Sequence, residues 1–224
     1  MKKNDLDDNI SVGVDLGITI PAYCALSDGK RRLAIGSEDD LLRVRMQMQN
    51  RRRSLQKRAK MVAGGKGRNK KLKTLDALTK KEKNYVTTYN HMISHNAVKF
   101  AKDNKAATIK LEFLEGYGQE EKNKFILRNW SYFQLQTMIE YKVKMENIKV
   151  VYIDPYHTSQ TCAECNNYEE GQRERQEQFI CKNEECRNYN EKVNADFNAG
   201  VNISRSDKVV TSKEECEYYS KNKE

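Results

Sequence analysis

Four of the six cysteines lie between positions 162 and 186, and they form two pairs. Cys162 and Cys165 have two residues between them, and Cys181 and Cys186 have four. Two such pairs joined by a short hairpin supply the four tetrahedral thiolates of a structural zinc site, in which no position is left for water. A redox dithiol of the first pair is the alternative, but its surroundings lack a thioredoxin-like context. The spacing therefore predicts a zinc ribbon over residues 158–192.

Three acidic residues that are far apart in the chain each stand at the end of an expected strand or helix: Asp15, Glu112 and Asp196. Carboxylates that come together repel one another, so a cluster of them is stable only when cations neutralise it. Oxygen ligands favour Mg²⁺ or Mn²⁺, and two such ions about 3.5–4 Å apart can activate water and stabilise the leaving oxygen of a phosphodiester. The acids thus predict phosphodiester hydrolysis by a two-metal mechanism. The alternative is that each carboxylate only makes a local turn.

Short strands and longer helices must position these acids. Alternating apolar residues predict five strands, over residues 10–17, 21–26, 31–35, 107–112 and 148–153. The first and fourth of these strands end near Asp15 and Glu112. Apolar periodicity predicts helices over residues 38–60, 79–104 and 130–146, and a further helix that opens at 193 and carries Asp196. The helix over 130–146 is expected to supply much of the core through Trp130, Phe133, Leu135, Met138, Ile139 and Val143. The chain is thus an α/β protein.

The composition points to a polyanionic partner. Lys and Arg number 41 against 32 Asp and Glu, which gives a formal charge of +9 and favours nucleic acid over an acidic small molecule. No stretch approaches the roughly 20 apolar residues that span a bilayer, so a cytoplasmic protein is expected. Its 224 residues suit one mixed domain with an inserted module.

The positive charge is concentrated in one part of the sequence. We expect a flexible, basic patch that follows a phosphate backbone, formed by Arg51, Arg52, Arg53, Lys66, Arg68, Lys70 and Lys71. The residues from Gly64 to Lys71 would be its mobile loop. A solvated surface without a ligand is the alternative for any single residue of the patch.

Four motifs in this order resemble the RuvC-type catalytic half of the miniature type V CRISPR effector nucleases and their transposon-encoded TnpB relatives. They are Gly13-Val14-Asp15-Leu16-Gly17, Leu111-Glu112, the stretch from Asp154-Pro155 through Thr158-Ser159-Gln160 to the first cysteine pair, and Asn194-Ala195-Asp196 with Asn198-Ala199. The resemblance covers nearly the whole chain from Ser11 to Ile203. It implies an RNase H-like fold with a mixed sheet flanked by helices.

The resemblance also assigns roles. It places Asp15, Glu112 and Asp196 in the positions of the family's catalytic acids, where they hold magnesium. It places the cysteine quartet in the target-nucleic-acid-binding module. Arg173 matches a family arginine that reaches the scissile phosphate. The implied activity is that of an RNA-guided DNA endonuclease.

One departure from the family concerns length. Family members carry an N-terminal half that reads a short DNA motif and grips the guide RNA, whereas this sequence starts just before the first catalytic strand. The expectation is a nuclease core over 1–157, the ribbon, a third acidic motif over 193–205 and a disordered, charged tail over 206–224. Guide RNA would then bind through a missing half or a partner chain, and a homodimer is a further expectation. The alternative is a non-cleaving nucleic-acid-binding module, a remnant or a regulator.

Overall fold

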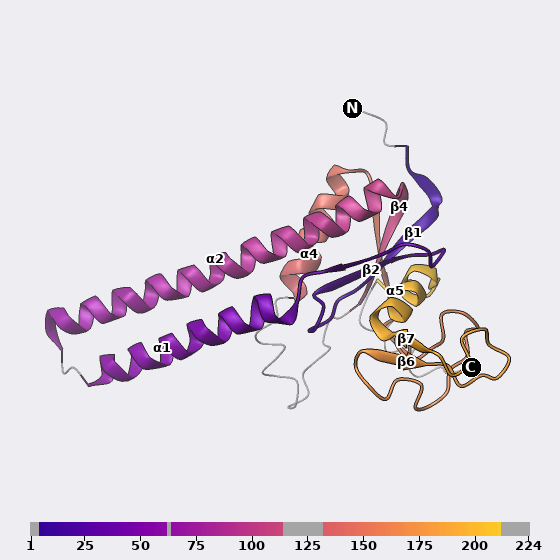
Figure 1. Cartoon of the computed structure of the whole chain (residues 1–224). Helices are drawn as coiled ribbons and strands as arrows, with labels where there is room; N and C mark the ends of the chain where they lie inside the picture. Colours follow the sequence, from indigo (N-terminus) through magenta and orange to yellow (C-terminus); the bar gives the residue numbers. More distant parts are fainter. Residues whose placement is uncertain (1–4, 62–63, 114–131, 212–224) are drawn as a thin grey trace.

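The fold is built on one mixed sheet, and the computed structural model describes residues 5–61, 64–113 and 132–211. The sheet has the strand order β3-β2-β1-β4-β5, shown in Figure 1. Its strands are β1 (Asp7–Asp15), β2 (Ala22–Leu26), β3 (Arg32–Ile35), β4 (Ala106–Glu112) and β5 (Lys149–Ile153). The first three form an antiparallel meander, whereas β4 runs parallel to β1, and β5 runs parallel to β4. The predicted α/β class and the five strands are therefore confirmed.

In the described part of the chain, four α-helices and a second, two-stranded sheet accompany the mixed sheet. The helices are α1 (Val44–Lys60), which follows a π-helical turn η1 (Asp39–Arg43), α2 (Gly65–Asp103), α4 (Tyr132–Met145) and α5 (Ala195–Arg205). A two-stranded sheet of β6 (Gln178–Ile180) and β7 (Lys192–Asn194) lies beside α5 in Figure 1. We call residues 158–192 the cysteine module. This small sheet belongs mostly to the module, but its strand β7 continues to Asn194, directly before α5. In the described part of the chain, no helix combines the length and apolar character that crossing a membrane requires.

The alternation of side chains along β1 separates the two faces of the sheet. Val12 and Val14 are fully buried in the main core together with apolar residues of α2 and α4. Gly13 points to the other face, where a Cβ atom would lie 2.0 Å from the carbonyl oxygen of Gly200 in α5. The hydroxyl of Ser11, on the same face, donates a 2.7 Å hydrogen bond to the carbonyl of Ser204. Helix α5 therefore packs directly on the backbone of β1.

Helix α4 confirms most of the predicted core. Leu135, Met138, Ile139 and Val143 are buried, as the apolar periodicity predicts. Phe133 is not, because its side chain is 81% exposed on the outer side of the helix. Trp130 lies outside the described residues.

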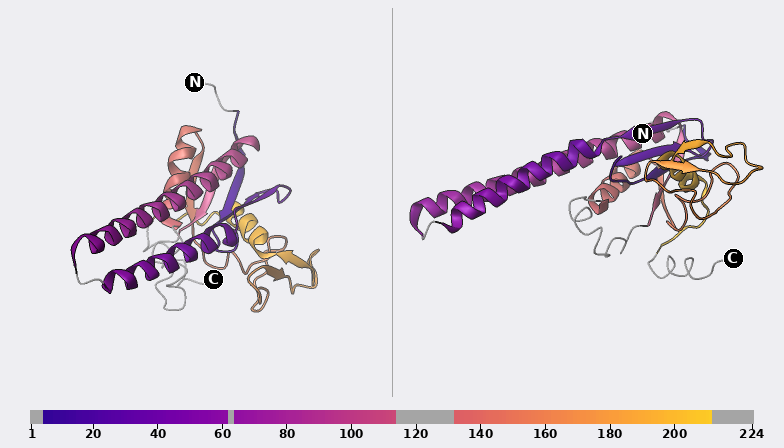
Figure 2. Two further views of the ribbon diagram at one scale, coloured as in Figure 1. Left: turned by 60° about the vertical axis from the view of Figure 1, so that its left-hand side comes forward. Right: turned by 60° about the horizontal axis from the view of Figure 1, so that its bottom comes forward.

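Helix α2 begins 14 residues before the predicted start at residue 79, and this corrects the expected mobile loop over 64–71. The glycines in this stretch suggested a loop, but Lys, Arg, Asn and Leu around them are compatible with a helix. Gly64 and Gly65 have positive φ angles of 151° and 76°, so they make the turn from which α2 starts. Figures 1 and 2 show α1 and the first half of α2 running side by side away from the sheet. We call residues 44–83 the arm.

The expected disordered tail is wrong for its first residues. The segment after α5 returns to the sheet, where Asp154 donates its backbone N–H to the carbonyl of Lys208 and Val210 donates to that of Tyr152. The side chain of Val210 is buried. Residues 212–224 lie outside the described part of the chain, and the prediction for them stays untested.

Candidate functional site

The three predicted acids line one cavity at the carboxyl ends of β1 and β4. The parallel register pairs Val14 with Leu111, so the next residues, Asp15 and Glu112, end neighbouring strands. Their side chains point to the face that α5 covers, because they alternate with the buried Val14 and Leu111. Asp196 lies in the first turn of α5. The cavity has a volume of about 280 Å³.

The electrostatics of this cavity are unfavourable without a cation. Burial, together with the negative charges of Glu112 and Asp196, raises the pKa of Asp15 well above its usual value. Burial likewise raises the pKa of Glu112 to about 7. Burial raises the pKa of Asp196 above its usual value, although the nearby guanidinium of Arg173 offsets part of this shift. A bound cation would stabilise the charged form of all three carboxylates.

Asp15, Glu112, Asp196 and Thr158 line the same cavity. An oxygen-rich lining of this kind suits a hard divalent cation.

Two further polar side chains orient the acids. The hydroxyl of Thr158 donates a hydrogen bond to Oε1 of Glu112, which favours the ionised form of that carboxylate. Nη2 of Arg173 lies 3.7 Å from Oδ1 of Asp196 and donates a 2.9 Å hydrogen bond to the carbonyl of Gln176. Arg173 thus reaches the cavity from the cysteine module, and its contact with a phosphate stays a prediction.

The sequence alone does not place Thr158 or Tyr132 at the cavity wall. Thr158 belongs to the third motif of the family resemblance, but nothing in its spacing indicates a contact with Glu112. Tyr132 also lines the cavity, and burial next to Asp15 and Glu112 raises the pKa of its hydroxyl. Tyr132 begins a helix 20 residues after Glu112, so only the folded chain reveals their proximity.

Helix α5 is fixed at the cavity by its own capping. Asn194 precedes the helix, and its side-chain oxygen accepts a 2.8 Å hydrogen bond from the backbone N–H of Phe197. Such an N-cap satisfies one of the free N–H groups at a helix start. A carboxylate in the first turn is also favoured by the helix dipole, which stabilises Asp196 where it stands.

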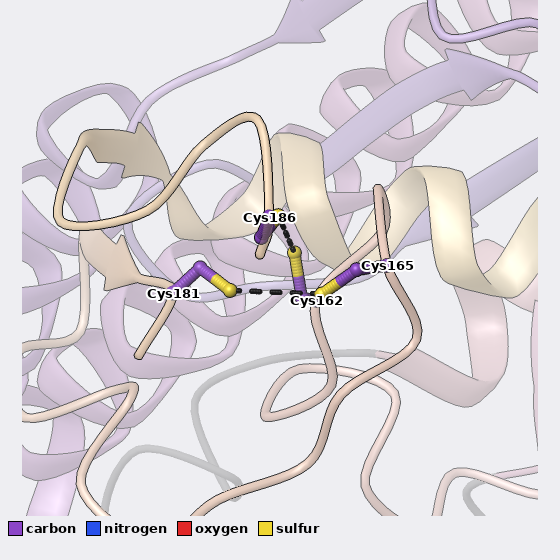
Figure 3. A group of neighbouring side chains, drawn as sticks. All are labelled: Cys162, Cys165, Cys181 and Cys186. Atoms are coloured by element: carbon purple, nitrogen blue, oxygen red, sulfur yellow. Dashed lines mark hydrogen bonds between the residues drawn. The ribbon is translucent and has the colours of Figure 1, made fainter. Parts of the chain in front are cut away.

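The four cysteines come together, as predicted. Figure 3 shows their sulfur atoms facing one another, with Cys162 and Cys186 3.8 Å apart and Cys165 and Cys181 3.7 Å apart. All four sulfur atoms lie within 4.8 Å of one another. A tetrahedral ion with metal–sulfur bonds of about 2.3 Å has sulfur–sulfur edges of about 3.8 Å. The cluster therefore has the donor set and the dimensions to hold a metal ion.

Two asparagines of α5 join the cysteine cluster to the acidic cavity. Asn198, which is buried, accepts a 2.9 Å hydrogen bond from the N–H of Ala163 and donates a 2.7 Å bond to the carbonyl of Thr161. Asn202, one turn later, donates to the carbonyls of Thr158 and Thr161. The segment that carries the first cysteine pair is thus bound to the helix that carries Asp196.

The predicted basic residues lie on the arm, on α1 and α2, and not at the cavity. Residues 44–83 contain 15 Lys and Arg against two Asp and Glu, so the arm is more positive than the whole chain, whose formal charge is +9. Arg51, Arg53, Lys66, Arg68 and Lys70 are exposed, and Lys71 is half-buried. Arg52 differs from them, because it pairs with the buried Glu82 of α2, which also lies 3.5 Å from Arg45.

Comparison with known proteins agrees with the motifs. A family profile described as "Cas12f1-like, TNB domain" matches residues 132–203, from α4 to α5. The CRISPR-associated endodeoxyribonuclease Cas12f1 of Sulfoacidibacillus thermotolerans is 35% identical over 210 residues, which cover 92% of this chain. The resemblance to the miniature type V CRISPR nucleases is confirmed.

Solved structures give the same result for the fold. A Cas12f1–sgRNA–target DNA complex matches with a TM-score of 0.72 and 30% identity over 92% of this chain, and a CRISPR-Cas12f ternary complex with 0.74 and 31% over 95%. The match covers 48% of the Sulfoacidibacillus Cas12f1 and 40% and 42% of the two solved chains. The chain thus spans about half the length of the Cas12f proteins that it matches, or less.

Proposed function

We propose that the chain is the nuclease part of an RNA-guided DNA endonuclease of the Cas12f or TnpB kind. The observation that carries the proposal is the meeting of Asp15, Glu112 and Asp196, from two strands and a helix, at one cavity. The similarity to proteins named endodeoxyribonucleases supports DNA as the substrate. The sheet order, with a meander followed by two parallel strands, supports an RNase H-like fold of the RuvC type.

In this proposal the three acids, Thr158 and Arg173 have distinct roles at the cavity. The carboxylates of Asp15, Glu112 and Asp196 hold Mg²⁺ or Mn²⁺. Bound metal supplies activation of water and stabilisation of the leaving oxygen at a phosphodiester. The Thr158 hydroxyl orients Glu112 and favours its ionised form, and Arg173 would offer its guanidinium to the scissile phosphate next to Asp196.

We further propose that the cysteine module is a zinc ribbon. Four thiolates at tetrahedral spacing favour zinc, and a site filled by protein ligands is structural. Its contribution to activity is to hold Arg173 and Thr158 in place beside the acids. Exposed cations of the arm, such as Arg51, Arg53 and Lys66, would contact phosphates without reading bases.

The partners follow from the same similarity. One neighbouring structure is titled as a complex with sgRNA and target DNA, so guide RNA and DNA are the partners proposed for the complete assembly. Guide RNA would bind with the help of a further protein segment or a partner chain. Pairing of two copies into a homodimer stays a prediction, which sedimentation of the purified chain would test.

The decisive experiment replaces the acids one at a time by the neutral isosteres Asp15→Asn, Glu112→Gln and Asp196→Asn. The chain is incubated with single-stranded DNA and Mg²⁺ or Mn²⁺, alone and with guide RNA and the part of a relative that this chain does not match. Cleavage should fall by at least about 100-fold in each variant. Glu191→Gln, at an exposed acid of the cysteine module, is the matched control.

A second measurement keeps the proposal testable if the isolated chain does not cut. Electron paramagnetic resonance of Mn²⁺ should detect binding to the chain and its loss in Asp15→Asn. Cleavage that survives Asp15→Asn would refute the site. Nucleic-acid binding with neither Mn²⁺ binding nor cleavage would favour the second candidate, a non-cleaving binding module, which the positive arm supports.

A further inference from the structure

Three aromatic rings contact one another next to residues of the cavity. The imidazole of His157 contacts the rings of both Tyr156 and Tyr168, with ring centroids 3.7 Å and 3.9 Å away and ring planes inclined by 64° and 42°. Tyr168 is the most exposed of the three residues, at 47%. We call Tyr156, His157 and Tyr168 the aromatic row.

The chain connects this row to both proposed sites. Tyr156 and His157 stand between Pro155 and Thr158, which line the acidic cavity. Tyr168 lies in the hairpin of the first cysteine pair, where it forms a β-bridge with Thr161. A ligand that touches the row would therefore lie next to the cavity, on its cysteine-module side.

The backbone of His157 has a conformation that is unusual for a residue other than glycine. His157 has a φ of 58°, in the left-handed region, which costs a residue with a side chain about 1 kcal/mol or more. Its carbonyl accepts hydrogen bonds from the N–H groups of Gln160 and Thr161, and Nδ1 lies 2.9 Å from Oε1 of Gln160. These contacts hold the strained residue, but the turn itself needs only its backbone. Glycine would make the same turn at lower cost.

The charge of the cysteine module argues against attraction of phosphates as its main way of binding. Residues 158–192 contain eight Asp and Glu against five Lys and Arg. Four metal-bound thiolates would add further negative charge. An acidic module that contacts nucleic acid needs a contact that does not depend on phosphate charge, and stacking of bases on aromatic rings is such a contact.

We propose that the aromatic row is a stacking platform for an unpaired base of single-stranded nucleic acid, next to the phosphodiester held at the acidic cavity. A duplex hides the faces of its bases, so the ligand must be single-stranded at this point. Tyr168, the most exposed of the three, offers its ring to the base, and His157, which also contacts Tyr156, packs against Tyr168. This inference rests on the proposed function, because it takes nucleic acid as the ligand of the same cavity.

The test uses the full chain, without added divalent ions so that no cleavage occurs. Single-stranded DNA oligonucleotides carry 2-aminopurine, a base whose fluorescence is quenched by stacking, at each position in turn. Quenching should appear at one or two neighbouring positions only. Tyr168→Ala should remove it and weaken binding about fivefold or more, as expected from the loss of one stacked base.

Three variants separate stacking from structural effects. Tyr168→Phe keeps the ring and should keep the quenching, whereas Tyr168→Leu keeps apolar bulk without an aromatic face and should lose it. Tyr189→Ala removes another exposed tyrosine of the same module, 43% exposed, and should change nothing. An abasic site at the quenched position should weaken binding to the unaltered chain but not weaken it further in Tyr168→Ala.

The outcomes distinguish the two proposals. DNA binding with no quenched position, or with equal affinity in Tyr168→Ala and the unaltered chain, overturns the platform and leaves the nuclease proposal standing. Quenching that Tyr168→Leu retains also overturns the platform. A chain that binds no single-stranded DNA at all overturns both.

Discussion

The carbonyl oxygen of Gly200 in α5 occupies the space in which Gly13 of β1 would carry a side chain. A Cβ atom on Gly13 would lie 2.0 Å from that oxygen and 2.5 Å from the backbone nitrogen of Ser204. Two positions further along β1 stands Asp15, and four positions before Gly200 stands Asp196. The contact between the two glycines therefore sets how closely two of the three acids approach each other.

Gly13→Ala should displace α5 and disturb the cavity. We expect a loss of stability of at least about 2 kcal/mol, measured by urea unfolding, because backbone and not a flexible side chain must move. Cleavage and Mn²⁺ binding should fall with it. Gly200→Ala is the graded comparison and should cost less, since its Cβ would lie 3.0 Å from Cβ of Ala25 and 3.6 Å from the nearest backbone atoms, those of Ala25 and Tyr23. Equal stability of Gly13→Ala and the unaltered chain would contradict the close packing.

Stability without divalent ions should depend on the ionisation of Glu112. Its pKa is raised to about 7 by burial, above the unfolded value of 4.5, so the folded chain binds this proton more tightly than the unfolded chain. The protonated carboxyl therefore leaves stability intact below pH 4.5, and stability declines as pH rises from there to 7. The decline is up to about 3 kcal/mol, less the screening by water in the cavity.

Glu112→Gln has no titrating group at position 112 and should lose this part of the decline, whereas Glu191→Gln should keep it. Urea unfolding at pH 5 and pH 8 measures the difference. Added Mg²⁺ should restore stability at pH 8 in the unaltered chain and in Glu191→Gln, but not in Glu112→Gln. A pH dependence that is identical in Glu112→Gln would disprove this account of Glu112.

Removal of the metal from the cysteines should also destabilise the start of α5. Structural zinc contributes on the order of 10 kcal/mol to small modules, so its loss should unfold residues 158–192 while the sheet stays folded. Metal analysis should find one zinc ion per chain. Hydrogen exchange should then show lost protection in the module and also at the start of α5, because Asn198 and Asn202 would lose their partners. Free, fast-reacting thiols in a fully stable chain would contradict a structural metal.

Asn198→Ala tests the link between the module and α5 directly. It leaves the N–H of Ala163 and the carbonyl of Thr161 without their side-chain partner, and should cost about 1–3 kcal/mol. Zinc content should stay at one per chain, whereas cleavage should fall because Arg173 and Thr158 are no longer fixed to the helix of Asp196. Glu184→Ala, at an exposed residue of the same module, is the control. Unchanged cleavage in Asn198→Ala would show that the link does not position the site.

The arm should bind nucleic acids of any sequence through exposed charge. Replacing Arg51 and Arg53 by Gln should weaken binding to all sequences alike and reduce the slope of log affinity against log salt by about 2 at most. Arg52→Gln should behave differently, because it breaks the pair with Glu82 and destabilises the arm. Binding isotherms at several salt concentrations measure both effects. Strong preference for one DNA sequence over scrambled controls would contradict a sequence-tolerant arm.

The acids and cysteines were predictable because their signals are local. Strand alternation and chain position placed Asp15 and Glu112 at strand ends, and the two cysteine pairs have a spacing that few other sites share. The start of α2 was missed because Gly65 and Gly67 resemble helix breakers. In the folded chain α1 contacts this part of α2, where Nζ of Lys71 donates a 3.0 Å hydrogen bond to the carbonyl of Arg58. Phe133 is an apolar residue on the outward face of α4, so its residue type alone wrongly indicated a core position. The contacts of Thr158 with Glu112 and of Val210 with β5 join distant segments, and no local pattern contains them.

The return of residues 208–210 to β5 also protects the outer edge of the sheet. β5 is the last strand in the sheet order, and an edge strand presents free N–H and C=O groups that can pair with another molecule. The backbone bonds from Asp154 to Lys208 and from Val210 to Tyr152 occupy part of that edge. A chain cut before Lys208 would keep every residue of the acidic cavity and still expose β5 to intermolecular strand pairing. Aggregation, measured by light scattering, would then limit the yield of such a shortened protein before any defect in the acidic cavity became visible.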